Sequence, residues 1–159
     1  MLDGFRQFIA DIASGASHEP RGFADDDYRL AATALLIHVV SLDGKPSDVE
    51  IKTLHALLEQ RFALNPGDAD RLIDAATRVE GDAVDLYHFT SRIMRSLDER
   101  GRARIVEMMW EMVYADNTVT EFEESVVWRA ADLLGISSEE RIALKHRVAV
   151  NHKASNATS

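Results

Sequence analysis

The sequence contains no cysteine, and this absence excludes several kinds of chemistry at once. Disulfide bonds, thiol nucleophiles and cysteine-ligated zinc or iron–sulfur sites cannot form without thiols. Long apolar runs are lacking too. The strongest run, residues 30–40, is interrupted by Thr33 and His38 and is much shorter than the roughly 20 apolar residues of a membrane span. We therefore expect no direct insertion into a membrane.

Positive charge is also scarce, because 18 lysines and arginines face 27 aspartates and glutamates, for a formal net charge of −9. A protein that binds nucleic acid needs a basic face for the phosphates, so we expect no nucleic-acid partner. The start of the chain has neither the basic residues nor the continuous apolar run of a signal peptide. The expected location is the cytoplasm.

Recognisable catalytic motifs are missing as well. The six histidines are scattered, with no H-E-x-x-H spacing, and the chain has no G-x-S-x-G, P-loop or dinucleotide-binding fingerprint. His38 is better explained as a partly buried polar residue than as a metal ligand. No pair of nucleophile and base can be assigned from spacing, so we predict that the protein is not an enzyme.

The chain does contain abundant helical periodicity, and no segment alternates with the period of a strand. Residues 1–22 are expected to form an N-terminal helix, over 2–12, and a linker rich in Gly, Ser and Pro. That helix is more simply explained as docked on the core than as a membrane-surface or partner-binding element. Residues 25–150 form the main helical domain, and residues 151–159 a disordered polar tail. The expected fold is an all-α bundle of about seven helices, over about residues 26–42, 47–62, 66–80, 85–97, 102–115, 120–134 and 137–150.

The main domain has two halves that resemble each other at an offset of 73 residues. Residues 34–50 (ALLIHVVSLDGKPSDVE) then align with residues 107–123 (EMMWEMVYADNTVTEFE). Few residues are identical, but the succession of helix, acidic turn, helix, turn and helix occurs twice. The sequence therefore predicts two pseudo-symmetric helical repeats.

Each repeat contains one turn of the form Asp-x6-Glu, made by Asp43 and Glu50 in the first and by Asp116 and Glu123 in the second. Both turns include S/T-x-x-E, the capping box, in which a hydroxyl and a glutamate bond the backbone at a helix start. Helix capping alone can therefore explain the serine or threonine and the glutamate. Alternatively, the carboxylates and the turn's backbone oxygens suit a hard divalent cation. The capping box does not require Asp43 or Asp116, so these two residues are the ones that distinguish metal binding from capping.

These residues also resemble the TerB family of tellurite-resistance proteins. The resemblance lies in the apolar helix ending in LDG, the following KPSDVE, the later ADNTVTEFE after Trp110 and Tyr114, and the closing ADLLGIS. It covers about residues 25–150. It implies an all-α bundle with internal two-fold pseudo-symmetry. It also implies divalent-metal binding by an acidic cluster, here Asp43, Glu50, Asp116 and Glu123. Two positions depart from the family pattern, Asn117 in place of Gly and Leu42 in place of Ala.

The leading functional hypothesis is a non-enzymatic, TerB-like stress-response domain that binds a divalent cation at the paired acidic turns. The ion could be calcium, magnesium or zinc. The alternative is a helical protein–protein adaptor, associated with co-chaperones or a membrane complex, in which the turns act only as caps. Both hypotheses imply a protein partner in a stress-response complex. The sequence leaves the oligomeric state open, a dimer included, and it leaves open whether the two turns converge in space.

Overall fold

The computed structural model of the chain describes residues 27–42, 44–82, 86–115 and 119–158. Within these ranges the backbone forms seven helices and no strand, which confirms the predicted all-α fold. The predicted helix over residues 2–12 and its linker lie outside the described residues. The helices are α2 (Tyr28–Val40), α3 (Asp48–Arg61), α4 (Pro66–Asp82), α5 (Leu86–Ser96), α6 (Glu99–Val113), α7 (Glu121–Leu133) and α8 (Ser138–Thr158).

Helix α2 is the centre of the bundle. It contacts α3, α4, α5, α6 and α7, and all of its residues except Tyr28 and His38 are buried. Asp27 caps its N-terminus by accepting from the Arg29 N–H at 2.9 Å, and the same carboxylate pairs with the Arg29 guanidinium at 2.6 Å. An apolar helix with no polar face is stable only when it is surrounded. The prediction that this helix is central is therefore confirmed.

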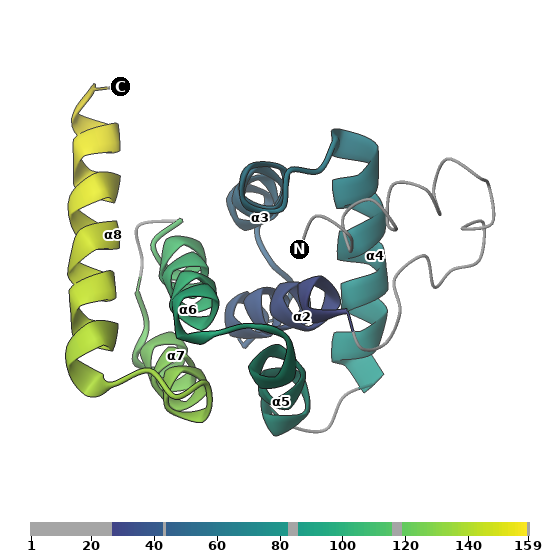
Figure 1. Cartoon of the computed structure of the whole chain (residues 1–159). Coiled ribbons are helices and arrows are strands. Elements are labelled where there is room, and N and C mark those ends of the chain that lie inside the picture. Colours follow the sequence, from purple (N-terminus) through teal and green to yellow (C-terminus); the bar gives the residue numbers. More distant parts are fainter. Residues whose placement is uncertain (1–26, 43, 83–85, 116–118, 159) are drawn as a thin grey trace.

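The other helices are arranged on both sides of α2 (Figure 1). Helix α4 packs against α2 and α3 at one edge of the molecule, whereas α8 packs against α6 and α7 at the opposite edge. The core includes Met108, Met109 and Met112 of α6, each almost completely buried. The expectation that this methionine group belongs to the core is confirmed. Because α6 lies between α2 and α8, both of its faces are used for packing.

Two helix boundaries differ from those predicted. The predicted helix over residues 102–115 was expected to begin after Gly101, but α6 begins at Glu99, because the carboxylate of Asp98 accepts from the Gly101 N–H at 2.9 Å and caps it. Gly81 was expected to break the chain, yet α4 continues to Asp82. A glycine costs a helix only about 1 kcal/mol relative to alanine, which capping and packing can offset.

The end of the chain differs as well. Helix α8 continues through residues 151–158, which the sequence analysis assigned to a disordered tail. The segment is polar, with Asn151 and Lys153 exposed, but it contains neither proline nor glycine. Nothing in the segment therefore interrupts the helical hydrogen bonds that begin at Ser138, and the helix propagates beyond its packed part.

The helix boundaries can be compared with the predicted repeat. Helices α2 and α6 end at Val40 and Val113, and helices α3 and α7 begin at Asp48 and Glu121, in each case at the offset of 73 residues. The contacts of α2 with α4 have a counterpart in those of α6 with α8. The pseudo-symmetric relation of the two halves in space stays a prediction.

In the described part of the chain, no helix combines the length and the apolar character that crossing a bilayer requires.

Candidate functional site

The first acidic turn leads into α3 through a complete capping box. Ser47 has extended backbone angles, and its hydroxyl accepts from the Glu50 N–H at 3.1 Å. The Oε1 atom of Glu50 accepts from the Ser47 N–H at 2.7 Å. Glu50 is only 6% exposed, so this backbone donor partly replaces the water that the carboxylate lost on burial. The cap predicted from the sequence is confirmed.

The second turn repeats this arrangement at the start of α7. The Thr120 hydroxyl accepts from the Glu123 N–H at 3.1 Å, and Glu123 Oε1 accepts from the Thr120 N–H at 3.0 Å. The same Oε1 atom lies 3.2 Å from the Thr120 hydroxyl. Glu123 is 5% exposed, almost the same as Glu50. The two halves therefore bury equivalent carboxylates at equivalent helix starts.

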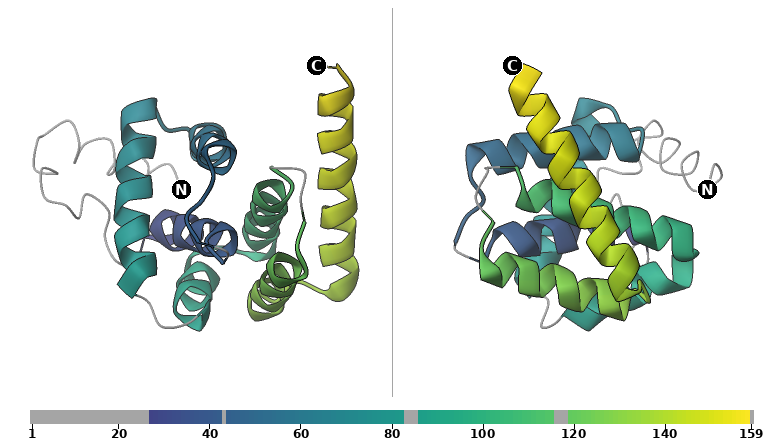
Figure 2. Two further views of the ribbon diagram at one scale, coloured as in Figure 1. Left: turned by 180° about the vertical axis from the view of Figure 1, so that it is seen from behind. Right: turned by 90° about the vertical axis from the view of Figure 1, so that its left-hand side faces the viewer.

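The two capped helix starts lie at the same end of the molecule. The right-hand view of Figure 2 shows the N-terminal ends of α3 and α7 at the left of the picture, next to the C-terminal ends of α2 and α6. Helices α2 and α6 contact each other and run in broadly the same direction. Each buried glutamate also lies at the positive end of its own helix dipole, which stabilises a carboxylate.

The two aspartates of the predicted metal site, Asp43 and Asp116, lie outside the described residues, and so does Asn117. Among the residues that are described, no group of three or more histidine, aspartate or glutamate side chains is arranged to hold a metal ion. Of the four predicted metal ligands, the structure therefore describes two, Glu50 and Glu123. In both residues the capping bond from the backbone N–H is accepted by Oε1.

The backbone at Gly44, in the first acidic turn, has a turn conformation that favours glycine. The Gly44 N–H donates to the Ser41 carbonyl at 3.1 Å, and Gly44 has φ of +128°, a conformation that L-residues with a side chain rarely adopt. His38, one turn earlier, is partly buried, as the sequence analysis expected. The positive φ explains why a glycine occupies this position of the turn.

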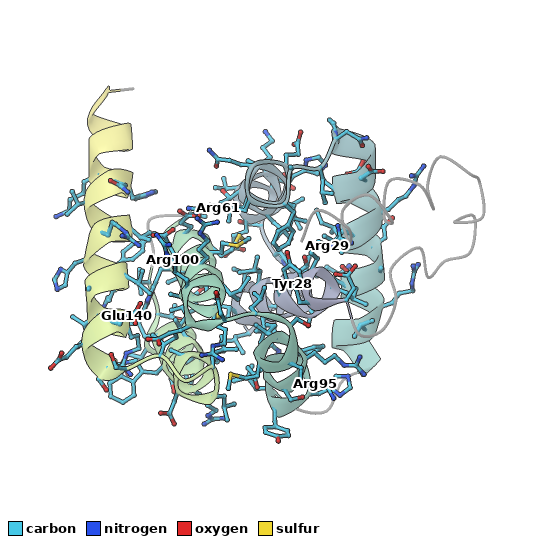
Figure 3. The ribbon with its side chains drawn as sticks, viewed as in Figure 1. Tyr28, Arg29, Arg61, Arg95, Arg100 and Glu140 are labelled. Carbon is cyan, nitrogen blue, oxygen red and sulfur yellow. The ribbon has the colours of Figure 1, made fainter. Side chains whose placement is uncertain are left out.

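A charged network that the sequence analysis missed joins α3, α6 and α8. Arg61 of α3 is labelled in Figure 3. Its guanidinium lies 3.1 Å from Glu107 and 2.7 Å from Glu111 of α6, and Arg147 of α8 lies 2.5 Å from Glu107. Burial raises the pKa of Glu111 above its usual value, and the charge of Arg61 opposes that rise. The i, i+4 spacing of Glu107 and Glu111 places both on one face of a helix and could have been noticed in the sequence. Their arginine partners could not be predicted, because they come from helices distant in the sequence.

Comparisons with known proteins support the family resemblance. The sequence profile of the family described as Tellurite resistance protein TerB matches residues 29–146, which include all of α2 except Tyr28, α3 to α7, and part of α8. No significant match was found among curated proteins or among solved structures. Because the matched segment covers most of the chain and contains both capped acidic turns, the protein belongs to the TerB family.

Proposed function

We propose that this chain is a non-enzymatic, TerB-type stress-response domain that binds one divalent cation with Asp43, Glu50, Asp116 and Glu123. The observation that carries the proposal is the pair of buried glutamates, 6% and 5% exposed, held in the same way at helix starts on one end of the molecule. A surface cap needs neither burial nor duplication. A cation site built from two turns requires the duplication, because each turn supplies carboxylates. Burial shields these carboxylates from water and so strengthens their attraction to a cation.

The donor chemistry favours a hard cation. The chain has no cysteine, and the proposed ligands are carboxylate and backbone oxygens, which calcium and magnesium prefer over the nitrogen and sulfur ligands typical of zinc. Carboxylates that are brought together repel one another unless a cation neutralises them. The bound ion would therefore link the two halves of the bundle, and its role would be structural.

The test is the melting temperature in the presence and absence of calcium or magnesium. A ligand that binds only the folded state adds about 2.7 kcal/mol of stability at a concentration 100 times its Kd. The wild type should therefore melt at a higher temperature with the ion. The double variant Asp43→Asn with Asp116→Asn should lose this increase, because it removes two charged ligands.

The matched control changes the same number of charges elsewhere. Asp74 on α4 and Asp132 on α7 are exposed, so Asp74→Asn with Asp132→Asn should keep the full ion-induced increase. If no divalent ion raised the melting temperature of the wild type, the acidic turns would act only as helix caps. An equal loss in the control would mean that the ion acts through general surface charge.

A separate observation favours an adaptor role as the second candidate. Val49 and Phe122 occupy equivalent positions beside the two capping glutamates, and they are 50% and 73% exposed. Exposed apolar side chains that gather into one patch are typical of docking surfaces, and the first turns of α3 and α7, which contain these two residues, lie at the same end of the molecule. An adaptor would bind one stoichiometric partner with or without chelator, and Val49→Ser with Phe122→Ser would abolish that binding.

A further inference from the structure

A cleft between α6, α7 and α8 has a chemical character unlike the rest of this acidic chain. Its volume is about 360 Å³, and its lining includes Trp110 of α6, Glu124 and Trp128 of α7, and Arg141 and Lys145 of α8. None of the described residues of the acidic turns belongs to this lining. The cleft is therefore a feature separate from the proposed cation site.

A buried indole is part of the inner lining of the cleft. Trp110 is 1% exposed, and its Nε1–H has no hydrogen-bond acceptor among the described residues. A buried donor without an acceptor costs about 1–3 kcal/mol. Buried tryptophans usually satisfy this group, so an unpartnered indole N–H beside a cleft favours a ligand that supplies an acceptor.

A second buried donor comes from the α8 wall. Arg141 is 6% exposed, and its guanidinium carbon lies 3.8 Å from the centre of the Trp128 ring. Its Nε atom has no acceptor within the described part of the chain. Stacking on an aromatic face stabilises the cation but satisfies none of its in-plane N–H groups.

The charges of the cleft leave one cation unbalanced. Glu124 is the one carboxylate of the described lining, and it pairs with Lys145, whose ammonium also lies 5.4 Å from the centre of the Trp110 ring. Arg141 has no carboxylate partner within ion-pair distance among the described residues. The cleft therefore offers a net positive charge, two unsatisfied donors and aromatic walls. Trp128, 58% exposed, forms its open rim.

We propose that this cleft binds a small carboxylic acid in its anionic form, with the carboxylate attached to a flat apolar group. The carboxylate oxygens would accept from Arg141 and from the Trp110 indole, and the flat group would lie against the aromatic rings. A volume of about 360 Å³ is at the lower end of the range for small-molecule sites, which suits a free acid better than a peptide.

The probe is 3-phenylpropanoate, and its neutral isostere 3-phenylpropanamide is the comparison ligand. The chain has only two tryptophans, and both line the cleft, so intrinsic tryptophan fluorescence reports on this site directly. The acid should change that fluorescence saturably. The amide should bind about tenfold more weakly or worse, because it loses a charge-assisted hydrogen bond.

Substitutions then locate the site by calorimetric titration of the acid. Arg141→Gln should weaken binding about tenfold or more. Arg95→Gln, the same chemical change at an exposed position of α5 far from α8, should leave it unchanged (Figure 3). Trp128→Leu should also weaken binding. Because Trp128 is exposed, this variant is expected to fold, and it keeps the test available if Arg141→Gln does not fold.

Four outcomes would overturn the proposal. The first two are that the acid does not bind, or that the acid and the amide bind equally well. The third is that Arg141→Gln and Arg95→Gln affect binding equally. The fourth is that the cleft binds a peptide with a C-terminal phenylalanine but not the free acid. Failure here would leave the cation proposal intact, because Glu50 and Glu123, the described residues of the proposed cation site, do not line the cleft.

Discussion

At the scale of single residues, Glu50 and Glu123 have a structural role that is independent of any ion. Each is buried and completes a capping box through Oε1. Aspartate or alanine at these positions would leave the backbone N–H of Ser47 or Thr120 without this acceptor. Glutamine, the other residue found at this position of capping boxes, keeps the same carbonyl-type acceptor without the charge.

Glu50→Gln and Glu50→Ala should therefore differ in stability. In urea unfolding without divalent ions, the alanine variant should lose about 1 kcal/mol or more, because the cap is broken. The glutamine variant should lose less than the alanine variant, because its side-chain carbonyl can still accept from the Ser47 N–H. The same order is expected for Glu123→Gln and Glu123→Ala. If glutamine proved as destabilising as alanine, the carboxylate charge would matter more than the cap.

The residue scale also shows why part of the site was predictable. The capping boxes join residues three positions apart, so the pattern S/T-x-x-E contains all the information they need. The buried Arg141 against Trp128 depends instead on how α7 and α8 pack. A single sequence carries no pattern for that contact, and neither partner stood out before the fold was known.

At the scale of elements, helices α3 and α4 are joined by a histidine. His55 Nδ1 lies 2.8 Å from Glu59 of its own helix, and His55 Nε2 lies 2.7 Å from Asp70 of α4. The hydrogen bond with Glu59 is the main cause that raises the pKa of His55 above 6.5, desolvation opposes the rise, and Asp70 adds to it. The protonated imidazole therefore links the two helices.

This link makes stability depend on pH in a defined direction. Because the pKa of His55 is higher in the folded state than in the unfolded state, its contribution is fully present below about pH 6.5 and is lost as the pH rises through the raised value. Urea unfolding at about pH 6 and about pH 8 should show this loss in the wild type. His55→Gln should reduce the difference, whereas a difference unchanged in His55→Gln would assign it to other groups.

Element boundaries were predictable where a local signal was unambiguous. The sequence predicted that the helix over residues 120–134 ends at Gly135, and α7 ends at Leu133 with Gly135 at φ +73°. It misplaced the start of α6, because Gly101 suggested a break and the cap made by Asp98 was overlooked. It also missed the helical 151–158 segment, because polar composition alone does not distinguish an exposed helix from a tail.

At the scale of the whole molecule, the architecture follows from one helix that has no polar face. The all-round apolar sequence of α2 required burial, and five other helices supply it. The sequence therefore predicted the fold class and the central element. It could not predict that the starts of α3 and α7 lie at the same end of the bundle, because that depends on the packing of α2 against α6.

The central claim is that Asp43 and Asp116 bind one cation jointly from the two halves of the bundle. Isothermal titration of the ion-free protein with calcium, repeated with magnesium, tests it most directly by counting bound ions. We predict saturable binding of one ion per chain, lost in Asp43→Asn with Asp116→Asn and retained in Asp74→Asn with Asp132→Asn. Absence of binding to the wild type, or equal binding to both double variants, would contradict the account.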